Sequence, residues 1–205
     1  MAGQPTSPAL HISARIEESI DVKRRLLGDR AALEIIEAVA EELVRAYRRD
    51  GKVLIFGNGG SAADAQHIAA ELVGGFTVRE RPPLPVEALS VNTSALTAIA
   101  NDYDFTTVFA RQVAAFGRAG DVAIGLSTSG NSGNVIAALD VAKKNGLVTV
   151  GFTGQTGGKL AGRVDYCVRV PSDDTPRIQE VHILLGHIVC ELVELRLYPS
   201  DGGAR

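Results

Sequence analysis

Short apolar runs alternate with helical segments along this chain, and this alternation limits the possible folds more than any other feature. The runs lie at residues 52–57, 86–91, 121–126, 147–152 and 164–170. Strands that are apolar on both faces are typical of parallel sheets covered by helices on each side. We therefore predict one α/β domain in which a parallel sheet lies between two helical layers.

Helices are predicted between these strands, and two more precede the first strand. The N-terminal pair spans residues 12–47 and divides near Gly28; the others cover 62–73, 95–100, 132–145, 159–161 and 176–197. Ser61 is the expected N-cap of the helix at 62–73. Residues 1–11 are predicted to be a disordered tail, 12–198 the single domain, of flavodoxin-like αβα architecture, and 199–205 a flexible tail.

The composition excludes several classes of protein. The 21 Lys and Arg residues against 24 Asp and Glu give a net charge of -3, unlike a basic nucleic-acid-binding surface or a polybasic membrane anchor. No apolar run reaches the length of about 18 residues that a membrane span needs, and residues 1–10 lack the pattern of a secretory signal. Cys167 and Cys190 lie in apolar segments without a C-x-x-C motif, as buried thiols in a reducing compartment do. A cytoplasmic protein is predicted.

Two glycine- and hydroxyl-rich loops follow the strands at 52–57 and 121–126. The first is residues 57–61, GNGGS, and the second is residues 127–132, STSGNS. Both leave the carboxyl edge of the predicted sheet, where ligands of such folds bind. Each also precedes a helix, whose N-terminus attracts anions. The loops predict a phosphate site that needs no cationic side chain.

These loops allow two other interpretations. Gly57, Gly59 and Ala62 match a dinucleotide fingerprint formally, but the stretch about 20 residues on, 79–83 (RERPP), is a poor end for a second strand. The sequence contains no G-x-x-x-x-G-K-[ST] phosphate loop. Plain tight turns remain the structural alternative, but two loops at equivalent positions, one of them with four hydroxyls, favour a ligand site.

Two helices carry candidate metal ligands. His67 and Glu71 are four residues apart, so on a helix their side chains share one face, together with Asp64. Such a pair is commonly a solvated helix face; its position just after the first loop favours a ligand role. The last helix is mostly apolar but contains the polar residues Gln179, His182 and His187. His182 by itself is interpreted as a core histidine. The second half of a metal site would come from this last helix.

The motifs together resemble a known family. The run 125–132 is similar to the signature of sugar-isomerase (SIS) domains. Residues 58–62 with His67 and Glu71, the pair Asn101 and Asp102, and 177–182 with His187 narrow the resemblance to the phosphoheptose isomerase family, over residues 16–197. The resemblance implies a zinc-assisted aldose–ketose isomerase that forms D-glycero-D-manno-heptose 7-phosphate from sedoheptulose 7-phosphate through an enediolate. It also implies a homotetramer and a place at the first step of activated-heptose biosynthesis.

The resemblance assigns a role to each matching residue. One zinc ion per subunit would be held by His67, Glu71, Gln179 and His187, with Glu71 as the base and His187 as the acid. The implied substrate contacts are Asn58, Gly59, Gly60, Glu71, Asn101, Asp102, Ser127, Thr128, Ser129, Ser132 and Gln179.

Several alternatives stay open at this point. Gln179 and His187 are separated by about 12 Å of helical rise, so either both lean toward one point or they serve sites in different subunits. Some relatives carry an acid where this chain has Pro176, and Asp173 or Asp174 is the nearest substitute. The rival functions are a non-catalytic SIS protein that binds a partner, such as the replication initiator, and a sugar-phosphate sensor. The four implied ligands favour the enzyme.

Overall fold

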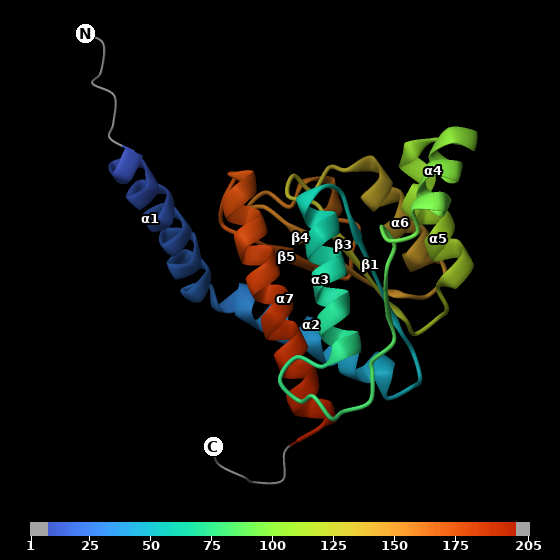
Figure 1. The fold of residues 1–205 in the computed structure, drawn as a ribbon. Coiled ribbons are helices and arrows are strands. Elements are labelled where there is room, and N and C mark those ends of the chain that lie inside the picture. Colours follow the sequence, from blue (N-terminus) through green and yellow to red (C-terminus); the bar gives the residue numbers. More distant parts are fainter. Residues whose placement is uncertain (1–7, 200–205) are drawn as a thin grey trace.

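A computed structural model describes residues 8–199 and shows five parallel strands between helices (Figure 1). The strands are β1 (Val53–Gly57), β2 (Val86–Ala88), β3 (Val122–Leu126), β4 (Val148–Thr153) and β5 (Tyr166–Arg169), in the spatial order β2-β1-β3-β4-β5. This is the doubly wound order of flavodoxin-like folds. The predicted α/β architecture with a parallel sheet is confirmed.

Helices cover both faces of the sheet. On one face lie α2 (Arg30–Tyr47), α3 (Gly60–Gly74) and α7 (Thr175–Leu197); on the other lie α4 (Thr93–Asp102), α5 (Val108–Phe116) and α6 (Gly133–Lys144). The strands supply side chains to both layers in alternation, so that Ile55 packs in one core cluster and Phe56 in the other. Helix α1 (Pro8–Leu27) extends outward from the first layer (Figure 1).

The register of the sheet brings the two glycine-rich loops together. Strand β1 pairs in parallel with β3, and Gly57 at the end of β1 lies opposite Leu126 at the end of β3. The chain order reverses at this point, because β2 lies on the other side of β1. The loops 57–61 and 127–132 therefore leave the sheet side by side at the switch point, where ligands bind in folds of this kind.

Several element boundaries differ from those predicted. Helix α1 begins at Pro8, so residues 8–11, which the sequence predicts to be part of the disordered tail, are helical. The other predicted tail residues, 1–7 and 200–205, lie outside the described residues. Helix α3 has Gly59 as its N-cap residue, which places Ser61 within the first turn rather than at the cap. Residues 105–116, for which no element is predicted, form the 3-10 turn η1 (Phe105–Thr107) and α5.

The predictions for membrane spans and for the two cysteines concern residues that the structure describes. Within residues 8–199, none of the helices is both long and apolar enough to cross a bilayer. Cys190 is buried and Cys167 is half-buried, and both are free thiols.

The buried histidine of α7 has the core role that the sequence predicts. His182 is fully buried, Nε2 lies 3.2 Å from the carbonyl oxygen of Thr153, and Nδ1 has no hydrogen-bond partner among the described residues. Burial lowers the pKa of His182 to about 4, although the hydrogen bond to Thr153 acts in the opposite direction. The imidazole is therefore neutral at pH 7 and serves packing.

This histidine makes stability depend on pH. Between pH 6.5 and about 4 the unfolded chain binds a proton at His182 that the folded chain does not, so the unfolding free energy falls as the pH is lowered. We expect His182 to contribute about 2–3 kcal/mol to the loss between pH 7 and pH 4.5. Urea unfolding of wild type and His182→Gln at pH 7 and at pH 4.5 measures the contribution of His182 to the change in unfolding free energy. An equal pH dependence in the two proteins would argue against it.

Candidate active site and metal centre

The close approach of α3 and α7 creates the candidate site. Gly186 makes this possible, because a Cβ atom at that position would lie 2.5 Å from the side chain of Ile68 on α3. The next residue, His187, faces His67, which precedes Ile68. A small residue at the helix contact therefore lets two histidines from distant parts of the chain meet.

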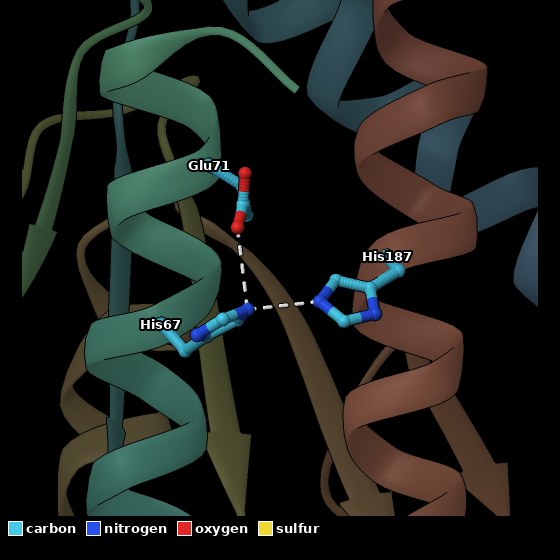
Figure 2. A group of neighbouring side chains, drawn as sticks. All are labelled: His67, Glu71 and His187. Carbon is cyan, nitrogen blue, oxygen red and sulfur yellow. Dashed lines mark hydrogen bonds and ion pairs between the residues drawn. The ribbon is translucent and has the colours of Figure 1, made fainter. Parts of the chain in front are cut away.

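His67, Glu71 and His187 form a compact group (Figure 2). Nε2 of His67 lies 2.9 Å from Nε2 of His187 and 3.2 Å from Oε1 of Glu71. The three potential ligand atoms all lie within 4.8 Å of one another. One carboxylate oxygen of Glu71 points toward His67 and the other points away from it (Figure 2). The side chain of His67 is 50% exposed and that of Glu71 is 26% exposed, so the group is open to solvent.

This geometry fits a divalent metal ion. Zinc bonds to nitrogen and oxygen are about 2 Å long, so two ligands of one ion lie within about 4 Å of each other. The two separations, 2.9 Å between the Nε2 atoms and 3.2 Å from Nε2 of His67 to Oε1 of Glu71, satisfy this limit. Nitrogen and carboxylate ligands without sulfur are typical of catalytic rather than structural zinc sites. The chain thus carries a possible metal-binding group, made within a single subunit.

Gln179 lies beside the start of α3. Its side-chain amide packs on Gly60 at the start of α3, where a Cβ atom would come within 2.5 Å of Nε2. Gly60 precedes His67 by seven residues, about 10 Å of helical rise. The structure therefore brings three of the four predicted ligands together and places Gln179 beside the first loop.

Asp64 lies on α3 between Gly60 and His67. Its atom Oδ2 is buried and has no hydrogen-bond partner among the described residues. Burial raises the pKa of Asp64 to about 6, and the nearby His67 opposes this effect. The face predicted for Asp64, His67 and Glu71 is thus present.

The two loops are joined by a pair of asparagine side chains. Asn58 and Asn134 exchange two amide hydrogen bonds, of 2.9 and 2.8 Å. Asn134 is 4% exposed and stands in the first turn of α6, directly after the second loop. No role was predicted for Asn134; the signal in the sequence is a polar amide in the first turn of a helix that follows a ligand-type loop.

The hydroxyls of the second loop bond to one another. Oγ of Ser127 lies 2.9 Å from Oγ of Ser132, and Oγ of Ser129 accepts the backbone N–H of Asn131. Gly130 has φ +66°, and a Cβ atom there would lie 2.1 Å from the carbonyl oxygen of Gly157. This glycine allows close backbone contact with the loop after β4.

Asn101 and Asp102 lie at the end of α4, in the opposite helical layer from the metal-ligand group (Figure 1). Both are exposed, and Nδ2 of Asn101 donates to Oδ1 of Asp102. Asp174 is the N-cap residue of α7, and Asp173 beside it is exposed. None of these four residues belongs to the group of His67, Glu71 and His187.

Comparison with known proteins agrees with this fold. Residues 18–154 match the family model described as the SIS domain, so the chain is a SIS-domain protein. A curated phosphoheptose isomerase from Roseiflexus sp. (strain RS-1) is 58% identical over 183 residues, which cover 89% of this chain and 91% of that protein. Another, from Aneurinibacillus thermoaerophilus, is 52% identical over 188 residues, 92% of this chain and 94% of that protein.

A solved structure gives the same result. The phosphoheptose isomerase of Neisseria gonorrhoeae is 45% identical, with a TM-score of 0.84 over 90% of this chain and 97% of that chain. The chain belongs to the phosphoheptose isomerase family and is an aldose–ketose isomerase. The resemblance seen in the sequence is confirmed.

Proposed function

We propose that this chain converts sedoheptulose 7-phosphate into D-glycero-D-manno-heptose 7-phosphate at the group formed by His67, Glu71 and His187. The observation that carries the proposal is the placement of two nitrogen ligands and one carboxylate on adjacent helices. One of these helices, α3, begins at the glycine-rich loop of the sheet's ligand-binding edge. The names of the close relatives support the choice of substrate.

The phosphate group binds at the second loop. Its ligands are the hydroxyls of Ser127, Thr128, Ser129 and Ser132, together with N–H groups at the start of α6. Helix N-termini favour anions, so no basic side chain is required. Sugar hydroxyls contact Asn58, Gly59, Gly60, Asn101, Asp102 and Gln179. The amide pair of Asn58 with Asn134 supports this arrangement, because it fixes one loop relative to the other.

His67, Glu71 and His187 would hold a zinc ion, with Gln179 as the fourth ligand. When bound, a divalent metal polarises the substrate carbonyl and stabilises the negative oxygen that develops beside it. Gln179 would complete the ligand set either from the same subunit or from a neighbouring one. The chemistry of the three grouped ligands supports zinc.

Isomerisation moves one proton between adjacent carbons. The carboxylate oxygen of Glu71 that points away from His67 takes the proton from the carbon next to the carbonyl, which leaves an enediolate. Glu71 then returns this proton to the former carbonyl carbon. When substrate displaces it from the metal, His187 would donate a proton to the carbonyl oxygen and recover one from the neighbouring hydroxyl. The two carboxylate oxygens of Glu71 point in different directions (Figure 2). This supports a role for one oxygen as metal ligand and for the other as base.

The active form is a homotetramer, with the sites at subunit boundaries. Helix α1 supports this assembly. Its buried side chains, Val22 and Leu26, lie in its second half, while Ile12 and Ile16 are more than half exposed. A second copy that covers these side chains would remove apolar surface from water. The enzyme acts in the cytoplasm at the first step toward activated heptose.

The test is turnover by the purified chain. Wild type is expected to bind about one zinc ion per chain and to form the aldose product, detected by NMR. His187→Ala is expected to lower kcat at least about 100-fold, because both a ligand and the acid are lost. A metal-loaded wild type without turnover would refute the substrate assignment. Near-normal turnover by His187→Ala would refute the role of His187 alone.

A further inference from the structure

His187 is in contact with an aromatic ring that the proposed reaction does not use. The ring of Phe76 stacks on the imidazole of His187, with a centroid separation of 5.3 Å and an interplanar angle of 14°. The ring of His67 meets the same imidazole at 64°, with centroids 5.0 Å apart. The imidazole of His187 is therefore packed on one face by Phe76 while Nε2 faces His67.

A sharp turn at Gly75 places Phe76 there. Gly75 has φ +95°, and a Cβ atom at this position would lie 3.0 Å from the carbonyl oxygen of Val78. Glycine adopts such a conformation at little cost, whereas other residues are strained by it. The chain leaving α3 passes the Glu71 end of the group and heads toward α7 (Figure 2).

A buried carboxylate on α7 holds the turn. Glu194 accepts the backbone N–H groups of Phe76, Thr77 and Val78 at 2.7, 2.7 and 3.0 Å, and the hydroxyl of Thr77 at 2.7 Å. Glu194 follows His187 by seven residues, two helical turns, so both project from nearly the same face of α7. One helix therefore positions both the imidazole and the attachment point of the ring that stacks on it.

The attachment is rigid because it is ionic and buried. Nε of Arg81 donates to Glu194 at 2.6 Å, and the two side chains are 1% and 0% exposed. Burial alone would raise the pKa of Glu194, but hydrogen bonds from Thr77, Arg81 and the backbone of Phe76 lower it to about 2. A second nitrogen of Arg81 donates to the carbonyl oxygen of Glu71. Arg81 therefore connects the segment after α3 to Glu71 on α3 and to Glu194 on α7.

From this geometry we infer that Phe76 is a positioning residue for His187: its ring fixes the plane of the imidazole so that Nε2 faces His67 and Glu71. The inference rests on the proposed function, in which His187 is a metal ligand and the acid. Mutation of hydrogen-bonding groups that orient a ligating histidine typically costs 10–100-fold in metal affinity, and we expect an effect at the lower end of this range from the stacked ring. A flat ring restricts rotation of the imidazole, whereas a branched aliphatic side chain of similar size does so less.

The test compares Phe76→Leu with Phe76→Tyr in the full chain. Zinc affinity is measured by competition with a chromogenic chelator, and the Co²⁺ absorption spectrum reports ligand geometry. Phe76→Leu is expected to weaken zinc binding about 10-fold, to alter the Co²⁺ spectrum, and to lower kcat more than it raises KM. Phe76→Tyr retains a flat ring and is expected to match wild type in zinc affinity, Co²⁺ spectrum and kinetic constants. Phe116→Leu, the same change at an exposed position on α5, is the matched control.

The outcomes separate this inference from the proposed function. If wild type binds zinc and Phe76→Leu binds it equally well with the same Co²⁺ spectrum, the positioning role is refuted and the metal site stands. If Phe76→Tyr is as weak as Phe76→Leu, the role of the flat ring is refuted. If wild type itself binds no zinc, the proposed metal site fails together with the inference, and turnover of the same sample decides whether the isomerase assignment survives.

Discussion

Replacing Glu71 by glutamine is expected to lower kcat for the isomerisation by about 10²–10⁴-fold, the usual contribution of a positioned general base. Glutamine has nearly the size of glutamate and keeps one oxygen, but it cannot accept a proton from carbon. The fold should be preserved, because Glu71 is partly exposed and its side chain contacts His67 rather than the core. The measurement is initial-rate formation of the aldose phosphate by NMR.

Two further measurements make this result specific to Glu71. Zinc content of Glu71→Gln separates loss of the base from loss of the metal, because a variant that retains zinc and is inactive lacks proton transfer. Glu34→Gln is the matched control, since Glu34 is 63% exposed on α2 and pairs with Arg30 one helical turn away. If Glu71→Gln kept kcat within tenfold of wild type, Glu71 would not be the base.

The second large effect is on stability and concerns Arg81. Arg81→Met leaves the carboxylate of Glu194 buried without its cation, and breaking a buried pair from one side typically costs about 3–5 kcal/mol. For a chain of 205 residues this corresponds to a fall in Tm of about 6–20 °C. Differential scanning calorimetry and urea unfolding at pH 7 measure the loss.

An exposed ion pair offers the matched comparison. Arg163 pairs with Asp140 at 2.8 Å, and the two side chains are 49% and 47% exposed. Arg163→Met is expected to cost less than about 1 kcal/mol, because water screens such pairs. A loss below 1 kcal/mol for Arg81→Met, or equal losses for the two variants, would show that the buried pair does not hold the turn after α3.

The sequence permits prediction of the features that depend on local spacing. The apolar runs predict a parallel sheet, and the loops 57–61 and 127–132 end neighbouring strands as expected. His67 and Glu71 share a helix face because they are four residues apart. The helical rise from Gln179 to His187 likewise indicates that these two side chains do not meet easily, and the structure places Gln179 near Gly60 instead.

Features that depend on packing between distant segments could not be predicted from spacing. His187 joins His67 because Gly186 packs on Ile68, a helix contact that neither sequence segment reveals by itself. Arg81 stands in a proline-rich connector, where a charged residue is normally exposed, yet it is buried against Glu194, 113 residues away. The N-cap prediction for Ser61 was wrong by two residues, because Gly59 with φ +57° already ends the loop.

Titration of zinc into the metal-depleted chain, with bound zinc and turnover of sedoheptulose 7-phosphate followed together, tests the central claim most directly. We predict that turnover is absent without metal, rises in proportion to bound zinc and reaches its maximum at one ion per chain. Full turnover by the metal-free chain, or full zinc occupancy without turnover, would contradict the assignment of isomerisation to the group of His67, Glu71 and His187.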